Sequence, residues 1–332
     1  MISIKNKFLA EHTFIDLFCG IGGFHLALSS FGARCVFASD INKDAQTSYQ
    51  KNFGICPYGD ITKIAVQDIP KHDVLCAGFP CQPFSISGNR QGFEDEQGRG
   101  RLFFNIVDIL HAHHPKVVLL ENVKNLEKHD KGKTLLRIKT ALEMEGYTVY
   151  SRVLCAADFG IPQARQRIYF IAFRNDLDVC DYQFPAGMNE FKTLDSVLIK
   201  DAENEIDGNY FINRECSLKK EDYNRSKRLI RIGQIGLGRQ GERVYSTKGL
   251  ASTLSSQSGG LGGKTGLYLI NGRVRKLYPR ECARLMGFPD SFVLAQTQER
   301  CYNQFGNSVV VDVLQHIINQ TQELWRKNNG TL

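Results

Sequence analysis

Apolar runs alternate with helical patterns through the first half of the chain, and this alternation restricts the fold more than any other feature. Six apolar runs indicate strands, at residues 13–18, 35–38, 74–77, 116–120, 147–154 and 167–173. Four segments have the apolar spacing of helices, at residues 22–31, 42–52, 102–110 and 134–144. Strands that alternate with helices build a sheet with helices on its faces. We therefore predict an α/β fold with a doubly wound, mostly parallel, Rossmann-like sheet.

The second half has a different pattern. Between about Pro185 and Val274 the chain is charged, glycine-rich and weakly periodic, which indicates a smaller domain with exposed loops. Near the end, residues 309–324 have the spacing of an amphipathic helix that returns to the large domain. The expected division is a large domain at 1–195 plus 306–332, a small domain at 196–278, and a hinge at 279–305.

Composition narrows the functional classes. The chain has 332 residues, is 42% hydrophobic, and carries a net charge of +7. A basic protein suits an anionic partner such as nucleic acid, although the charge alone decides little. The N-terminus lacks an apolar signal core and no run is long enough to span a bilayer, so we expect a soluble, intracellular protein. Ten cysteines without zinc-finger spacing predict neither disulfides nor a metal site.

A cysteine follows one of the buried strands. Cys81 lies in the turn Gly78–Ser85, directly after the apolar run 73–77. Ligands of open α/β sheets bind at the carboxyl ends of the strands, so a thiolate there is a candidate nucleophile. Glu121 follows the strand that we expect to end at Leu120, which brings a carboxylate to the same edge.

Two arginines at alternate positions, Arg165 and Arg167, precede or open a late strand. We expect them to point to opposite faces, so that one reaches the site and the other faces outward. A thiolate, a carboxylate and an arginine around one pocket suit an electron-poor ring. Cytosine is inert at carbon 5 until a nucleophile adds at carbon 6, and an acid at ring N3 would stabilise the product of that addition.

A glycine-rich turn lies between the first strand and the first helix, at residues 18–23. Glycines there let a ligand approach the backbone. Asp40 follows the second strand, where an acid can bind ribose hydroxyls, and Asp60 could accept from an adenine amino group. These residues predict a nucleoside cofactor. A dinucleotide dehydrogenase fits less well, because the third glycine position holds Phe24 or His25.

Six motifs occur in order: FIDLFCGIGGF, GFPCQPFSISG, ENV, QARQR, RECARLMGFP and QFGNSV. With them, over nearly its whole length, the chain resembles the bacterial cytosine-5 DNA methyltransferases. Residues 239–247 resemble the recognition region of the small enzymes that modify GCGC. The resemblance implies methylation of carbon 5 of cytosine in a short specific duplex sequence, GCGC or a related G·C-rich site. S-adenosylmethionine would be the cofactor.

The mechanism implied by the resemblance is base flipping with transient covalent addition of the nucleophile to carbon 6. It also implies a bacterial, cytoplasmic, nucleoid-associated monomer in a restriction–modification system. Its partners would be double-stranded DNA and a cognate endonuclease without stable contact, and it would need no membrane.

The resemblance also assigns roles to individual residues. Cys81 would be the nucleophile, Glu121 would contact N3, Arg165 would bind the target base, and Arg167 would support the site or the DNA backbone. The cofactor would be surrounded by Phe18, Gly20, Gly23, Asp40, Ile41, Asp60, Pro80, Asn307 and Ser308. Ser87 and Gln240 would fill the space vacated by the flipped base. The remaining expected DNA contacts are Arg243, Thr253, Gln257 and Gly260.

Two departures from the family pattern matter. Asp40-Ile41 stands where the family often has Glu followed by Trp, so we expect somewhat weaker cofactor binding. Gln257 stands where the GCGC enzymes carry an aromatic residue, which leaves the recognition sequence open. Two rival functions remain, a transfer-RNA methyltransferase of the same fold and a non-catalytic DNA-binding regulator. The DNA-enzyme-like recognition region disfavours the first, and the intact catalytic set disfavours the second.

Overall fold

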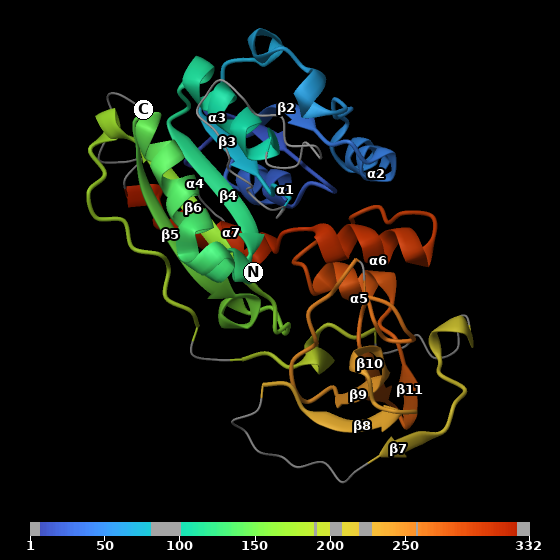
Figure 1. The fold of residues 1–332 in the computed structure, drawn as a ribbon. Coiled ribbons are helices and arrows are strands. Elements are labelled where there is room, and N and C mark those ends of the chain that lie inside the picture. The colour runs from blue at the N-terminus through green and yellow to red at the C-terminus, as the bar shows by residue number, and fades with distance from the viewer. Residues whose placement is uncertain are drawn as a thin grey trace.

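A computed structural model describes residues 7–80, 101–188, 191–199, 208–218, 228–256 and 258–323. These residues form two sheets, one of six strands in the order β2-β1-β3-β4-β6-β5 and one of five strands in the order β11-β10-β9-β8-β7. Figure 1 shows the two sheets in separate halves, with helices α5 and α6 between them. Within the described ranges, no helix is long and apolar enough to cross a membrane.

The large sheet is mostly parallel, as predicted. Strands β2, β1, β3 and β4 pair in parallel, and β6 and β5 add two antiparallel ladders at one edge. The strand order reverses between β1 and β3, which is where α/β sheets bind ligands. The strands are β1 (Thr13–Leu17), β2 (Arg34–Ser39), β3 (Val74–Ala77), β4 (Val117–Val123), β5 (Tyr147–Cys155) and β6 (Gln166–Arg174).

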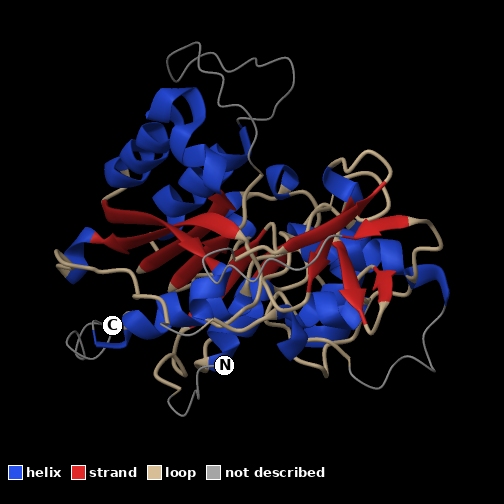
Figure 2. Cartoon of the chain, turned by 90° about the horizontal axis from the view of Figure 1, so that it is seen from below, coloured by secondary structure: helices blue, strands red, loops and turns tan. Residues whose placement is uncertain are grey.

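Helices cover both faces of this sheet, which confirms the doubly wound prediction (Figure 2). On one face, Leu28 of α1 and Ile317 of α7 belong to the same buried core. On the other, Ile106 of α3 and Ile138 of α4 are fully buried. The predicted returning C-terminal helix is therefore present. The helices are α1 (Gly23–Ser30), α2 (Lys43–Phe53), α3 (Arg101–His113), α4 (Lys133–Met144) and α7 (Val311–Gln320).

Strand β4 is longer than the sequence indicated. It runs to Val123, because it pairs with β6 as far as Val123 opposite Arg167. Glu121 therefore lies within the strand, opposite Tyr169, and the expectation that it follows the strand was wrong. A backbone ladder holds this carboxyl in place, whereas a loop residue would lack that support.

The small sheet has a modest core of its own around Ile232, Val244 and Leu267. A buried ion pair joins it to α5, since Arg275 Nη1 lies 2.8 Å from Glu281 Oε2. The predicted domain boundaries at residues 195, 278 and 305 stay predictions. The strands are β7 (Cys216–Leu218), β8 (Arg231–Ile235), β9 (Arg243–Ser246), β10 (Leu267–Ile270) and β11 (Arg273–Arg275), and the helices are α5 (Pro279–Arg284) and α6 (Gln298–Asn307).

Short 3₁₀ helices occupy several of the connections. They are Ile61–Lys63, Val66–Asp68, Lys124–Gly132, Ala156–Phe159, Asn175–Leu177, Leu194–Ser196, Gly208–Tyr210 and Gln240–Glu242.

Candidate active site

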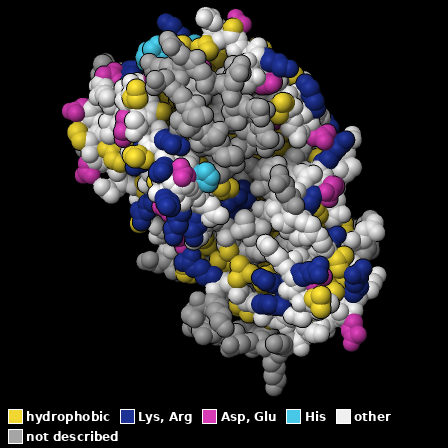
Figure 3. Space-filling model, in the orientation of Figure 1, with side chains coloured by type: hydrophobic (Ala, Val, Ile, Leu, Met, Phe, Trp, Pro, Cys, Tyr) yellow, Lys and Arg dark blue, Asp and Glu magenta, His cyan; other side chains and the backbone are white. Residues whose placement is uncertain are grey.

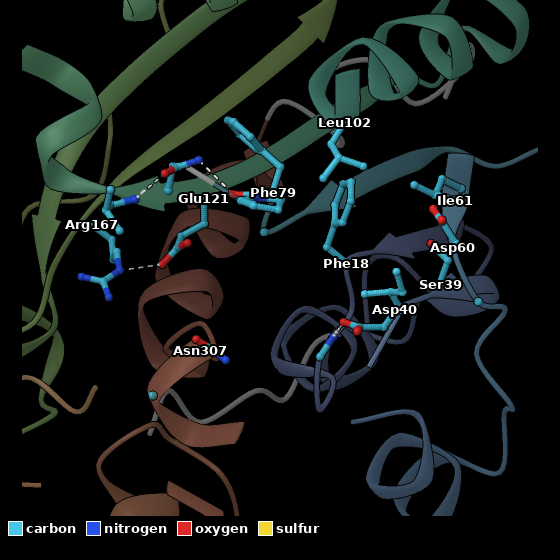
Figure 4. A pocket seen from close by; sticks show the side chains of 18 of the residues that line it. Phe18, Ser39, Asp40, Asp60, Ile61, Phe79, Leu102, Glu121, Arg167 and Asn307 are labelled. Carbon is cyan, nitrogen blue, oxygen red and sulfur yellow. Dashed lines mark hydrogen bonds and ion pairs between the residues drawn. The ribbon is translucent and has the colours of Figure 1, made fainter. Parts of the chain in front are cut away.

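A cavity of about 420 Å³ opens at the carboxyl ends of the parallel strands, at the point where the strand order reverses (Figure 4). That volume lies in the range of small-molecule sites. The start of β6 and the end of α6 complete its wall. Its lining residues are Phe18, Gly20, Ser39, Asp40, Ile41, Gly59, Asp60, Ile61, Gly78, Phe79, Pro80, Leu102, Glu121, Asn122, Val123, Arg165, Arg167, Gly306 and Asn307.

The glycine-rich turn after β1 forms one wall. Phe18 and Gly20 both have a φ of +53°, a backbone conformation that is strained for phenylalanine and free for glycine. A Cβ at Gly20 would meet no atom within 4 Å, so this part of the backbone faces open space. At Gly23 a Cβ would lie 2.5 Å from Val309 Cγ2. Gly23 does not line the cavity, and its smallness lets α1 pack against the chain that leads into α7.

Asp40 connects the end of β2 to this turn. Its Oδ2 accepts from the Gly20 N–H at 2.7 Å and its Oδ1 from the Asn42 N–H at 2.8 Å. Burial raises the pKa of Asp40, and these two hydrogen bonds oppose the rise. A carboxylate has further lone pairs, so Asp40 can still accept from a ribose hydroxyl. Its neighbour Ile41 is 72% exposed at the rim.

Asp60 lies further along the same wall. Its Oδ1 accepts from the Thr62 N–H at 3.0 Å and from the Thr62 hydroxyl at 2.8 Å. These hydrogen bonds lower the pKa of Asp60, so its carboxyl is an ionised acceptor. Asp60 thus begins the short helix Ile61–Lys63 and faces the cavity with a defined orientation.

Glu121 and Arg167 form an ion pair at the other end of the cavity, with 3.3 Å between Arg167 Nε and Glu121 Oε1 (Figure 4). They are diagonal neighbours across β4 and β6, a spacing that long side chains can bridge. Burial raises the pKa of Glu121, while the charges of Arg167 and Arg165 oppose the rise. A buried carboxyl with a raised pKa beside a cavity can donate a proton.

Arg165 is buried and makes different contacts. Its guanidinium donates to three backbone carbonyls, those of Leu254 at 3.1 Å, Gly306 at 3.2 Å and Ser308 at 2.6 Å. Burial lowers its pKa to about 10.

The expectation that Arg165 and Arg167 point to opposite faces was wrong, because both line the cavity. Residues two apart in an extended chain share a face, and the pleat alternates only between neighbours. Arg167 is the arginine that pairs with Glu121, whereas the terminal nitrogens of Arg165 are already bonded to carbonyl groups.

Sequence reasoning missed Asn122, which is buried in β4 and lines the cavity. Its Nδ2 donates to the Phe79 carbonyl at 2.9 Å, and its Oδ1 accepts from the Val123 N–H at 2.8 Å. This amide attaches the turn that leads from β3 toward Cys81 to strand β4. An amide within an otherwise apolar strand is the signal that could have revealed it.

The remaining expected site residues divide into three groups. Asn307 lines the cavity and Pro80 lies exposed at its edge, whereas Ser308 is buried behind it and donates its hydroxyl to the Val309 carbonyl. Cys81, Ser87 and Gln257 lie outside the described residues. The expected DNA contacts that are described lie away from the cavity, in the small half and the chain that connects it: Gln240, Arg243, Thr253 and Gly260.

Of these, Gln240 is exposed at the start of the short helix Gln240–Glu242, and Arg243 is exposed at the start of β9. The Thr253 hydroxyl donates to the Ala164 carbonyl at 2.8 Å, so it is engaged within the protein. Gly260 has a φ of +86° and is exposed. Among the residues that the structure describes, no group of three His, Cys, Asp or Glu side chains has the geometry of a metal site.

The fold and the cavity define an α/β enzyme with a wall suited to a nucleoside and an acid–arginine pair beside it. The family model for C-5 cytosine-specific DNA methylases matches residues 12–323, and the chain belongs to this family. Enzymes of the family transfer a methyl group from S-adenosylmethionine to carbon 5 of cytosine in DNA.

The relatives agree with this placement. The type II methyltransferase M.HhaI of Haemophilus parahaemolyticus is 50% identical over 319 residues, which cover 96% of each chain. The type II methyltransferase M.DsaV of Dactylococcopsis salina is 41% identical, over 92% of this chain and 84% of the relative. The crystal structure of the Dnmt2 methyltransferase of S. pombe has the same fold, with a TM-score of 0.70 at 24% identity over 96% of this chain and 99% of that one.

Proposed function

We propose that this enzyme methylates a cytosine within one short, G·C-rich duplex sequence, GCGC or a close relative, by covalent catalysis through Cys81. The observation that carries the proposal is the pair of the buried Glu121 with the half-buried Arg167, which faces the same cavity as the segment Gly78–Pro80. Cys81 directly follows that segment in the chain. A nucleophile, an acid and an arginine would therefore meet around one ring.

The opposite wall of the cavity fits S-adenosylmethionine. Gly20 offers an open backbone surface, Asp40 an acceptor for ribose hydroxyls, and Asp60 an ionised acceptor for the adenine amino group. Asn307 would close the pocket from the end of α6. The bound cofactor supplies the methyl group.

The reaction needs the target cytosine outside the duplex, because its ring face is inaccessible within the stack. The Cys81 thiolate adds to carbon 6 while the protonated Glu121 donates to N3, so that the electrons of the carbon 5–carbon 6 double bond become available at carbon 5. Carbon 5 would then take the methyl group, whose bond to the sulfonium sulfur of the cofactor would break and leave a neutral thioether. Loss of the carbon 5 proton restores the double bond, expels the thiolate and returns the N3 proton to Glu121.

Arg167 would orient the Glu121 carboxyl and hold the oxygen of the ring. This differs from the role first expected of Arg165, whose terminal nitrogens are bonded to carbonyl groups. Burial raises the pKa of Glu121, which supports its role as a proton donor.

Recognition of the sequence would fall to the small half. Figure 3 shows lysine and arginine side chains gathered where the two halves meet and over the small half, which suits a polyanion. Arg243 is exposed at the start of β9 and Gln240 in the short helix before it, and an arginine there can bond two acceptors of guanine. The resemblance of residues 239–247 to the GCGC enzymes favours that site. We also propose that the methyltransferase is a monomer and that it belongs to a restriction–modification system. The cognate endonuclease of that system would make no stable contact with it.

Duplex DNA that contains 5-fluorocytosine tests this chemistry, since fluorine at carbon 5 cannot leave as a cation. With cofactor present, the wild-type protein should form a covalent adduct that survives denaturation and maps to Cys81. The variant Cys81→Ala should form none. A wild-type protein that methylates ordinary DNA but never yields the adduct would refute covalent catalysis.

A further inference from the structure

The turn Pro162–Arg165, just before β6, pairs with the segment 247–266, which joins β9 to β10 of the small sheet and is called the returning chain below. The Ala251 N–H donates to the Pro162 carbonyl at 2.7 Å, and the Ala164 N–H donates to the Ala251 carbonyl at 2.9 Å. Gln163 and Ala251 thus form a parallel β-bridge. A segment of the predicted small domain is in this way held directly by the large sheet.

Gln163 extends this contact to a third element. It is fully buried, and its Nε2 donates to the Leu285 carbonyl at 2.7 Å, just past the end of α5. Its Oε1 accepts from the Leu254 N–H at 3.0 Å. One side-chain amide therefore connects the large sheet, the hinge and the returning chain, and both of its ends are satisfied.

Arg165, two residues after Gln163, also connects segments from both halves of the molecule. It is 3% exposed and donates to Leu254 on the returning chain and to Gly306 and Ser308 at the end of α6. These carbonyls belong to segments far apart in sequence. Bonds from a charged donor are stronger than neutral ones, and removing the donor leaves buried carbonyls without a partner.

The end of α6 also packs directly against the backbone of the returning chain. A Cβ on Gly306 would lie 2.4 Å from the Ser256 nitrogen and 2.5 Å from the Ser255 carbonyl carbon. One turn earlier in α6, Asn303 Oδ1 accepts from Lys264 Nζ at 2.8 Å. The loop that follows Ser258 is thereby fastened to the same helix, whose last residue, Asn307, lines the cavity.

We propose that Gln163 and Arg165 are positioning residues of an interdomain joint, made of these two side chains and the backbone groups of Leu254, Leu285, Gly306 and Ser308. The joint fixes the DNA-reading half relative to the cavity. The claim that this half reads DNA rests on the proposed function. The claim that Gln163 and Arg165 hold the two halves together does not, because it concerns the free protein.

The joint has a consequence for catalysis. A flipped cytosine reaches Cys81 and Glu121 only if the duplex lies at a set distance from the cavity, and the small half sets that distance. Loosening the joint at Gln163 leaves the cofactor wall intact, since Gly20, Asp40 and Asp60 make none of its contacts. Arg165 differs, because it bonds Gly306 and Ser308 on either side of Asn307, and its loss would also disturb the α6 end of the cavity. Gln163→Leu should therefore raise KM for duplex DNA and weaken discrimination between cognate and near-cognate sites, with little change in cofactor affinity.

Hydrogen–deuterium exchange of the full chain without DNA tests the joint. Gln163→Leu removes both amide contacts at similar volume, and Thr253→Val is the milder companion that deletes only the hydroxyl bond to the Ala164 carbonyl. Arg165→Lys keeps the charge but loses the planar set of donors. Gln183→Leu is the matched control, because Gln183 is exposed and bonds only Asp181 Oδ1.

In Gln163→Leu we expect exchange of the Leu254 amide to rise at least about tenfold, the effect of losing one buried hydrogen bond. Thr253→Val and Arg165→Lys should give smaller increases in the same peptide, and peptides of β1 and β3 should not change. Unchanged exchange in all three variants would overturn the joint, even if methylation by Arg165→Lys falls. A wild-type protein without methyltransferase activity would refute the proposed function. The exchange experiment would still test the joint, because it does not depend on methylation.

Discussion

Replacing Arg167 should move the pH dependence of the reaction in a direction set by the cavity. Arg167 Nε lies 3.3 Å from Glu121 Oε1, and the side chains are 16% and 10% exposed. At an effective dielectric constant of 20, Coulomb's law gives about 5 kcal/mol at this distance. Solvent screening and the cost of burying both charges reduce the net value to about 1.5–3 kcal/mol, as for hydrogen bonds to charged groups.

The sign of the change follows from the chemistry. Glu121 acts as an acid, so the rate falls as pH rises through its pKa. The positive charge of Arg167 lowers that pKa against the effect of burial. In Arg167→Gln the pKa is therefore higher, and the basic limb of the pH–rate profile moves to higher pH. Each 1.36 kcal/mol corresponds to one pH unit, so a movement of at least about one unit is expected.

Single-turnover methylation at saturating DNA and cofactor is measured across pH. It gives the midpoint pH of the basic limb separately from the maximal rate. Arg167→Gln will also slow the reaction, but the test concerns the midpoint alone. Arg152→Gln is the control, because it removes the same charge as Arg167→Gln. Arg152 is exposed on β5 and does not line the cavity. A midpoint that stays in place, or that moves to lower pH, would refute the electrostatic role assigned to Arg167.

Three further outcomes are expected. Gly20→Ala should weaken cofactor binding about tenfold in calorimetry, because an alanine avoids the roughly 1–2 kcal/mol cost of a φ of +53° only by moving the turn away from the shape that the cofactor requires; equal affinity would mean that this turn does not shape the site. Ile41→Trp should tighten cofactor binding several-fold by stacking on the adenine, worth about 1–3 kcal/mol per base on aromatic platforms, and weaker binding would place the adenine elsewhere. Glu281→Gln should lower the free energy of unfolding by about 3–5 kcal/mol in urea titrations, since it leaves Arg275 buried without its carboxylate; a loss below about 1 kcal/mol would show that the pair matters little.

Much of the large domain could be predicted because its signals are local. The apolar run at residues 74–77 coincides with β3, and the spacing of Phe24 and Leu28 marks the buried face of α1. The cavity wall at Phe18, Gly20, Asp40 and Asp60 could be anticipated for the same reason. Each residue follows a strand directly or begins a short helix, and sheet topology brings those ends together.

The remaining features depend on contacts between distant segments. The extension of β4 to Val123 comes from its pairing with Arg167, and nothing around residue 121 encodes that partner. The same holds for Gln163, whose partners are 91 and 122 residues away in sequence. The antiparallel direction of β5 and β6 was likewise not evident, since apolar runs carry no information on strand direction. The prediction that Arg165 and Arg167 face apart is wrong for another reason, because alternate positions of an extended chain share a face.

DNA from a bacterial host that expresses the protein tests the central claim most directly, by sequencing after chemical conversion of unmethylated cytosine. The account predicts one short G·C-rich motif in which a single cytosine resists conversion at nearly every occurrence. The same motif should be fully converted in cells that express Cys81→Ala or Glu121→Gln. Genomic DNA without resistant cytosines in the wild-type strain, or resistance that persists in Cys81→Ala, would contradict it.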